Sequence, residues 1–451
     1  MPGDQAYMYS GAARDLLTKA GAEIGDKISI RLRRGELEEQ VDGILMPRIH
    51  TGQEDYLVVK LRTGYNIGIQ TRNLTSIKVV GKGAEPHFTH PSLPTQRIGL
   101  PKVAILSTGG TIASKVDYRT GAVKPALDAE DLYSVVPELA DLADIRPKII
   151  SSTFSENIGP QNWSALAGSI AEEIKNGADG IVIAHGTDTL GYTAAALSFA
   201  LNSPPVPVVL VGSQRSSDRP SSDAAANLVA STAIASSAPF AHVVVAMHDW
   251  ISDKRIAIHL GTKVRKCHTS RRDAFESVNT SPLGYYDLVR NTIEMKSTSV
   301  SKRRSDSNWT IRPKFDSNVV LIKFYPGMSG AIIDWAVASG QSGIIIEGSG
   351  LGHISEAMFP AIERAINSEV VVAMTSQCIW GTVHMDVYST GRDLLRMGVI
   401  PLGDMLPETA LVKLMWVFGN TSSRQDAKSM MTKNLAGEFS DRRLLEKTHD
   451  D

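Results

Sequence analysis

The sequence predicts an α/β protein in which two parallel-sheet domains follow a small N-terminal β-barrel. Two patterns predict this architecture. From Lys102 onward, short apolar runs alternate with helical patterns, which is the order of βαβ units in a parallel sheet. Residues Gly25–Val80 instead carry five short alternating runs separated by turn residues, as is typical of a small β-barrel.

Changes in composition mark the expected boundaries between these parts. A short helix is expected at Ala6–Lys19, before the β-rich segment. Prolines, glycines and serines without periodicity follow Val80 and predict a linker. The expected divisions are a helix and β-barrel module at 1–85, a linker at 86–101, α/β domains at 102–310 and 311–425, and a polar tail at 426–451.

Apolar runs bounded by turn residues predict the strands, and apolar residues at a helical period predict the helices. In the first domain the expected strands are Val103–Leu106, Ile181–Ala184, Val206–Val211 and Val243–Met247, and the expected helices are Trp163–Asn176, Thr193–Ala200 and Ala224–Ser236. In the second domain the expected strands are Val319–Phe324, Gly343–Glu347 and Val370–Thr375, and the expected helices are Trp335–Ser339, Met358–Asn367 and Glu408–Phe418. The basic run Lys302-Arg303-Arg304 is interpreted as a solvated surface segment, with local phosphate binding as the alternative.

Composition restricts the class of protein. Of the 451 residues, 42% are apolar and 21% are charged, which is ordinary for a soluble globular protein. The net charge of −1 excludes a strong nonspecific attraction to nucleic acid or to a membrane surface. The two cysteines, Cys267 and Cys378, fit a reducing compartment, and the apolar context of Cys378 predicts a core position. No signal-peptide pattern or long apolar stretch is present, so we expect a cytoplasmic protein that does not enter a membrane.

Two loops that contain threonine follow predicted strands. Residues 103–115 read V-A-I-L-S-T-G-G-T-I-A-S-K, and residues 180–192 read G-I-V-I-A-H-G-T-D-T-L-G-Y. The glycine pair before Thr111 allows close approach to the backbone, and Thr187 stands next to the carboxylate of Asp188. Each loop alone is also compatible with a tight turn and a helix N-cap. Because α/β folds bind ligands at the carboxyl ends of their strands, the hydroxyls there predict a catalytic site.

The two motifs together resemble the bacterial-type L-asparaginase and glutaminase family, whose threonine motifs are T-G-G-T-I-A and H-G-T-D-T. The resemblance extends through most of residues 102–419 and implies an asparaginase-like catalytic unit that hydrolyses an amide. It implies that Thr111 is the nucleophile and that Tyr118 lies on a loop that closes over it. It also implies that Thr187 assists the attack and that Asp188 binds the ammonium group of an amino-acid substrate.

The same resemblance implies a catalytic lysine and a set of substrate contacts. Lys266 fits the lysine position best and could relay the proton of the threonine, while Lys263 is a near alternative. The segment Phe275–Gly284 matches the family and fixes the register. Substrate contacts are expected at Ser155, Glu156, Asp188 and Gly110.

Three segments go beyond a minimal asparaginase, namely the β-rich module, Val211–Leu228 and Ser376–Trp416. Together they resemble the D-subunit family of the archaeal-type glutamyl-tRNA(Gln) amidotransferases. This resemblance implies that the chain releases ammonia from glutamine or asparagine, and that a partner E subunit uses the ammonia to convert Glu-tRNA(Gln) to Gln-tRNA(Gln). It further implies that ATP and Mg²⁺ act in the partner, that this chain has no cofactor, that tRNA is contacted mainly through the partner, and that the chain forms a homodimer within a heterotetramer.

Two other functions are compatible with the sequence. A free cytosolic L-asparaginase or glutaminase would carry the same threonine motifs, although it would not need the β-rich module. A catalytically silent scaffold in an RNA-modifying complex would not need a complete set of catalytic side chains, and this chain keeps Thr111, Thr187, Asp188 and Lys266.

Overall fold

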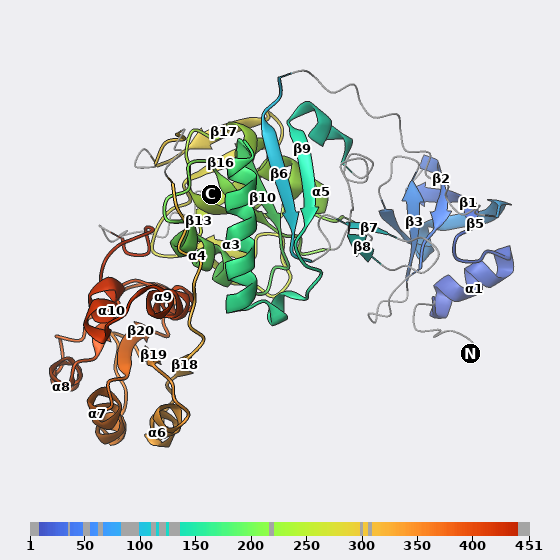
Figure 1. Ribbon diagram of the computed structural model, residues 1–451. Coiled ribbons are helices and arrows are strands. Elements are labelled where there is room, and N and C mark those ends of the chain that lie inside the picture. Colours follow the sequence, from blue (N-terminus) through green and yellow to red (C-terminus); the bar gives the residue numbers. More distant parts are fainter. Residues whose placement is uncertain are drawn as a thin grey trace.

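A small N-terminal module and two α/β domains make up the computed structural model of the chain (Figure 1). The structure describes residues 9–34, 37–47, 55–61, 66–82, 99–109, 114–116, 123–125, 136–215, 221–297, 301–304 and 309–440. Within these ranges, no helix combines the length and the apolar character needed to cross a membrane.

The N-terminal module is a five-stranded antiparallel sheet with one helix, α1 (Gly11–Ala20). In the order β4-β3-β2-β1-β5, the strands are β4 Asn66–Gln70, β3 Tyr56–Leu61, β2 Leu37–Leu45, β1 Lys27–Arg34 and β5 Leu74–Gly81, with a 3₁₀ helix η1 at Thr71–Asn73. Alternate residues of β1 (Ile28, Ile30 and Leu32) are buried because one face of the strand meets the core. The five predicted strands are confirmed, but closure into a barrel stays a prediction, since no pairing joins β4 to β5 among the described residues.

The first α/β domain is built on an eight-stranded sheet in the order β17-β16-β13-β12-β11-β10-β6-β9. Its strands are β6 Lys102–Ser107, β9 Asp144–Ile149, β10 Gly180–Ala184, β11 Val208–Val211, β12 Val243–His248, β13 Arg255–Leu260, β16 Gly284–Asp287 and β17 Thr292–Met295. The neighbouring strands β12, β11, β10, β6 and β9 pair parallel, whereas β13, β16 and β17 pair antiparallel. The predicted α/β class is therefore confirmed, with a sheet that is mixed rather than wholly parallel. Two short hairpins lie outside it, β7–β8 (Ser114–Val116 with Val123–Pro125) and β14–β15 (Val264–Lys266 with Phe275–Ser277).

Helices cover both faces of this sheet. The helices α3 (Pro160–Lys175) and α4 (Leu190–Leu201) pack on one face, and α5 (Ala224–Ser237) packs on the other. Neighbouring side chains of β6 therefore point to opposite faces of the sheet, so that Ile105 packs on the α5 side and Leu106 on the α3–α4 side. Two 3₁₀ helices, η2 (Pro137–Asp141) and η3 (Ser155–Asn157), lie in the connections before α3.

The second α/β domain has four parallel strands in the order β18-β19-β20-β21. Its elements are β18 Val319–Lys323, α6 Ala331–Ala338, β19 Gly343–Gly348, η4 Glu356–Met358, α7 Phe359–Asn367, β20 Val371–Ser376, α8 Ser389–Met397, β21 Ile400–Pro401, α9 Pro407–Asn420 and α10 Arg424–Met431. The helices α6, α7 and α8 pack on one face, and α9 and α10 pack on the other. The predicted strands and helices of this domain are confirmed, apart from shifts at their ends.

The two α/β domains share an apolar core between α4 and α9. Phe199 of α4 stacks on Trp416 of α9, with ring centroids 5.7 Å apart. Trp163 of α3 meets Phe315 edge-on at 5.5 Å between centroids. These rings bury large areas and prefer such geometries, so the shared core holds the domains in one arrangement.

Within the basic run at residues 302–304, Lys302 and Arg304 are exposed, but Arg303 is not a solvated side chain. Arg303 is half-buried and donates from Nε to the Ala238 carbonyl at 2.7 Å and from Nη1 to the Asp179 carbonyl at 3.0 Å, with a further bond to Ala235. Because α5 ends at Ser237, the bonds to Ala235 and Ala238 satisfy carbonyls at its C-terminus, where a cation is favourable. The interpretation as a solvated charge run is therefore wrong for Arg303.

The segment expected to be a polar tail from residue 426 begins inside α10 and stays folded up to Ser440. Ala427 and Met431 lie in the core shared with α9. Lys413 of α9 and Glu438 form an ion pair at 2.6 Å, and both side chains are 0% exposed. Lys413 also donates to carbonyls of residues 431 and 433. These polar contacts hold the segment in place, and the amino-acid composition of the segment does not predict them. Residues 441–451 lie outside the described ranges.

We predict that Lys413→Met destabilises the chain by about 3–5 kcal/mol, because it leaves the buried Glu438 carboxylate without its partner. The double variant Lys413→Met/Glu438→Gln should recover part of this loss, since it removes the unpaired charge as well. Denaturant unfolding of the three proteins would measure the difference. A single variant as stable as the parent would show that the pair does not hold the segment.

Candidate active site

The predicted catalytic loops meet at one edge of the first sheet. The strands β9, β6 and β10 are parallel, with Ser107 in register with both Ala184 and Ile149. The chain therefore leaves all three strands at the same level, as expected for a ligand site in an α/β fold. Residues 108–109, 150–155 and 185–188 follow directly and lie together at this edge.

The loop after β6 is fixed at its start by Thr108 and Gly109. Thr108 is buried, and its amide and Oγ1 both donate to the Ala184 carbonyl, at 3.0 and 3.1 Å. Gly109 has a φ of 118°, and a Cβ there would lie 2.3 Å from the Thr153 carbonyl oxygen. Only glycine fits this backbone, so sterics require a glycine at this position. Gly110, Thr111 and Tyr118 lie outside the described residues, and their roles stay predictions.

A chain of hydrogen bonds holds the second threonine loop. The Trp163 indole donates to Thr193 Oγ1 at 3.1 Å, and that hydroxyl lies 2.9 Å from His185 Nε2. His185 Nδ1 lies 2.7 Å from the Gly186 carbonyl, which only accepts, so Nδ1 carries the proton and Nε2 accepts. The neutral imidazole thus fixes the backbone that presents Thr187.

The structure brings Lys266 to the second threonine motif. Its Nζ donates to Thr187 Oγ1 at 2.8 Å and to Asp188 Oδ1 at 2.7 Å. The Lys266 side chain is 14% exposed, whereas that of Asp188 is 70% exposed. Water screens the ion pair, so it contributes orientation rather than stability. An ammonium in contact with a hydroxyl can give or take a proton at that oxygen, which is the chemistry predicted for this group.

The structure separates the two lysine candidates. Lys263 is buried and donates to Asp404 Oδ2 at 2.6 Å, a contact with the second α/β domain. Lys266, three positions later at the end of β14, contacts the threonine motif instead. Of these two lysines, Lys266 is therefore the one that contacts the threonine motif, while its catalytic role stays a prediction.

The serine–glutamate pair lies in η3, beside the second threonine loop. Thr189 Oγ1 donates to the Ser155 carbonyl at 2.6 Å, and a Cβ on Gly186 would lie 2.7 Å from Ser155 Cβ. Ser155 is buried against this loop, and Glu156 is exposed. The predicted substrate contacts at Ser155 and Asp188 thus share one site, while their binding roles stay predictions.

A buried polar network behind β11 was not anticipated from the sequence. Asp223 accepts from the amides of Gln214 and Arg215, and Asn227 donates to Asp223 and to the Gly212 carbonyl at 2.9 Å. A Cβ on Gly212 would lie 2.7 Å from Thr187 Cγ2, so the network supports the wall of the site. The spacing of an aspartate and an asparagine one helical turn apart was the available signal.

Neither cysteine belongs to the core. Cys267 and Cys378 are both exposed. Cys378 follows β20, and its amide donates to Ser376 Oγ at 3.0 Å in a turn that leaves the sheet. The predicted core position of Cys378 is therefore wrong, because the apolar run ends before it. In the described part of the chain, no cluster of three or more His, Cys, Asp or Glu side chains could hold a metal ion.

We predict that His185 makes folding stability depend on pH between about pH 4 and 6.5. Burial lowers its pKa from 6.5 to about 4, so the unfolded chain binds a proton that the folded chain does not. Its contribution is complete above pH 6.5 and is lost progressively as the pH falls toward 4. His185→Gln should be less stable at pH 7, but its melting temperature should fall less between pH 7 and 5. His384→Gln, at an exposed ring, is the control, and identical pH slopes for His185→Gln and the parent would contradict the prediction.

Comparison with known proteins identifies the families to which the three parts of the chain are similar. The family model "Asparaginase, N-terminal" matches residues 102–301, "Glutaminase/Asparaginase C-terminal domain" matches 318–431, and "GatD N-terminal domain" matches 22–80. The L-asparaginase of Thermococcus kodakarensis superposes with a TM-score of 0.66 and 35% identity, covering 75% of this chain and 99% of that one. L-asparaginase I of Vibrio cholerae gives a TM-score of 0.66 at 29% identity, covering 76% and 99%.

Other relatives extend over the N-terminal module as well. The D subunit of the glutamyl-tRNA(Gln) amidotransferase of Pyrococcus furiosus is 48% identical over 427 residues, covering 94% of this chain and 97% of the relative. That of Metallosphaera sedula is 47% identical and covers 97% of both chains. Because these relatives match the module together with both α/β domains, the chain belongs to the D-subunit family of the glutamyl-tRNA(Gln) amidotransferases, with an asparaginase-like catalytic unit.

Proposed function

We propose that this chain is the glutaminase component of a tRNA-dependent amidotransferase. It releases ammonia from glutamine, or from asparagine, for the conversion of Glu-tRNA(Gln) to Gln-tRNA(Gln). The similarity to the D-subunit relatives over the N-terminal module and both α/β domains carries this proposal. The contact of Lys266 with Thr187 supports the hydrolytic step, because it places a proton-transfer group on a hydroxyl at the strand ends.

The proposed reaction is the hydrolysis of a side-chain amide through an ester. The Thr111 hydroxyl attacks the amide carbon, the tetrahedral intermediate expels ammonia, and water then hydrolyses the ester. Lys266 and Thr187 transfer protons during these steps, with Asp188 orienting Lys266. Asp188, Ser155 and Glu156 bind the α-ammonium and α-carboxylate groups of the substrate, with Gly110 lining the site and Tyr118 closing over it.

We further propose how the chain acts within its complex. An E subunit accepts the ammonia and uses ATP and Mg²⁺ to activate the tRNA-bound glutamate, while this chain needs no cofactor. The chain forms a homodimer within a heterotetramer in the cytoplasm, and tRNA binds mainly through the partner. The net charge of −1 supports this division, since the chain has no excess of positive charge with which to hold a polyanion.

A free L-asparaginase is the alternative function. The two solved asparaginases named above are covered almost completely, yet they match only about three quarters of this chain. The asparaginase family models match residues 102–301 and 318–431, whereas the N-terminal module at 22–80 matches the GatD N-terminal domain, and the D-subunit relatives cover nearly the whole chain. The module therefore favours the amidotransferase function.

We predict that Thr111→Val abolishes glutamine hydrolysis and leaves the fold intact. Removal of a nucleophile from such a site typically lowers kcat by several orders of magnitude. Glutamate release by the assembled complex would measure the loss, and activity above about a tenth of the parent would reject Thr111 as nucleophile. Free ammonium should restore formation of Gln-tRNA(Gln), because the substitution spares the acceptor site.

We also predict that glutamine hydrolysis rises when the E subunit and Glu-tRNA(Gln) are added. Hydrolysis without an acceptor wastes glutamine, and differential binding of about 1.4 kcal/mol to the active form is enough for a ten-fold increase. The rate of glutamate release should be measured for the chain alone, with the partner, and with both. A chain that already works at the full rate alone would favour a free asparaginase.

A further inference from the structure

The strand that ends in Lys266 is anchored by the second α/β domain. In the turn before β14, the Thr262 carbonyl accepts from Thr409 Oγ1 of α9 at 2.9 Å, and Thr262 Oγ1 donates to the Ala436 carbonyl at 3.0 Å. Lys263 then reaches Asp404 at 2.6 Å. Residues from three separate parts of the second domain thus hold the beginning of this strand.

The Lys263–Asp404 pair is the charged contact among these. The Lys263 side chain is 2% exposed and that of Asp404 is 13% exposed, so water screens the pair little. Lys263 Nζ also approaches the Asp404 carbonyl at 3.3 Å, and Asp404 Oδ1 accepts from the Ser440 amide at 3.1 Å. Burial lowers the pKa of Lys263, and Asp404 opposes that effect by favouring the ammonium form. Each charge is therefore compensated, which a buried pair requires.

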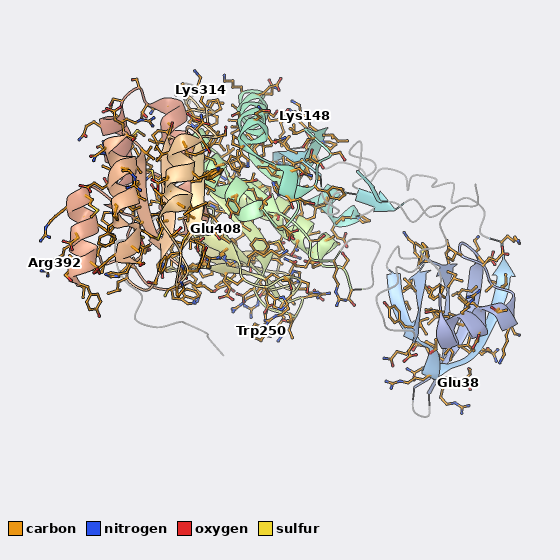
Figure 2. All side chains as sticks on the ribbon, turned by 90° about the horizontal axis from the view of Figure 1, so that it is seen from below. Glu38, Lys148, Trp250, Lys314, Arg392 and Glu408 are labelled. Atoms are coloured by element: carbon orange, nitrogen blue, oxygen red, sulfur yellow. The ribbon has the colours of Figure 1, made fainter. Side chains whose placement is uncertain are left out.

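The β14–β15 hairpin connects the anchored residues 262 and 263 to Lys266. Val264, Arg265 and Lys266 pair antiparallel with Ser277, Glu276 and Phe275. The Val278 amide donates to the Lys263 carbonyl at 2.8 Å, so both strands are fixed at the end where Lys263 lies. At the middle of the strand, Arg265 Nε lies 3.2 Å from Glu408 Oε1 of α9. Figure 2 labels Glu408 where the two α/β domains meet.

The chain that follows the second strand of the hairpin, β15, also contacts Asp404. Asn279 donates from Nδ2 to the carbonyls of Gly381 and Asp404, at 3.0 and 3.3 Å, and its Oδ1 accepts from the Gly381 amide at 2.8 Å. The Asp404 main chain and side chain thus contact both ends of the chain segment that carries β14 and β15.

We propose that the Lys263–Asp404 ion pair is a positioning device that sets Lys266 against Thr187. This inference rests on the proposed function of Lys266 in amide hydrolysis. Lys263 does not touch the threonine motif, and it acts only through the backbone of β14. The second domain thereby contributes to the geometry of a site whose described residues all belong to the first domain.

The expected effect is a loss of turnover rather than of binding. A displacement of about 1 Å in a catalytic group can cost about 100-fold in rate. Lys266 has a flexible side chain that compensates in part, so we expect kcat to fall about ten-fold or more. KM should change less than kcat, because the substrate contact at Ser155 is held by Thr189 rather than by Lys266.

The test uses full-length Lys263→Met and Asp404→Asn, each assayed alone and with the partner subunit. Both substitutions remove the ion pair with little change of volume, and Asn keeps an oxygen for the Ser440 amide. Arg364→Met is the control, because it also removes a cation from an ion pair of the second α/β domain, while its partner Asp334 lies on α6 and is not one of the contacts that anchor β14. Turnover is measured well below the lowest melting temperature of the set.

A lower kcat with a smaller change in KM in Lys263→Met and Asp404→Asn, and a parental kcat in Arg364→Met, would support the proposal. Turnover within two-fold of the parent in both test variants would overturn it, as would an equal loss in Arg364→Met. Crystal structures of Lys263→Met give a readout independent of activity, since Lys266 Nζ should leave hydrogen-bonding distance of Thr187 Oγ1. If the parent protein hydrolyses no amide, the proposed function fails, while the structural readout still decides whether Lys263 positions Lys266.

Discussion

Burial of α4 on two sides is the constraint on which the rest of the structure depends. The helix begins directly after the loop that carries Thr187 and Asp188, and nearly all of its residues are buried. Leu190, Ala194 and Leu197 pack on the first sheet, while residues on its other side pack against α9. A helix that is apolar all round is stable only inside a protein, so the second domain has to cover it. That packing fixes both the domain arrangement and the strand end that carries the threonine motif.

Apolar packing holds the domains together, and polar contacts add specific bonds at their junction. Hydrophobic burial is non-directional, whereas hydrogen bonds and buried ion pairs depend on distance and angle. At the junction, the polar contacts concentrate on the β14–β15 hairpin, through Thr262, Lys263 and Arg265. The domain interface therefore combines a general attraction with a few specific contacts, and these contacts fall on the strand that presents Lys266.

The N-terminal module has a small core of its own. Tyr9 links two of its segments, since its hydroxyl donates to the Met46 carbonyl at 2.8 Å and accepts from the Val58 amide at 2.9 Å. Among the described residues, its apolar cluster contains only residues of this module, from Tyr9 to Ile77. The module thus has a core of its own residues, and it matches the GatD N-terminal domain rather than either asparaginase model.

The sequence by itself determined the α/β class, most of the strands and helices, and the two threonine loops, because periodicity records which residues are buried locally. It did not determine partners far apart in the chain. Thr187 and Lys266 are 79 positions apart, and Lys263 and Asp404 are 141 apart, so two lysines in one short segment look equivalent until the fold assigns their contacts. Arg303 and Glu438 also look like surface charges in the sequence, because their partners lie in other segments. In the fold, Arg303 donates to the Ala238 carbonyl and Glu438 pairs with Lys413. Local pattern encodes burial, and only the tertiary structure decides which charges meet, because topology alone sets the distance between residues remote in sequence.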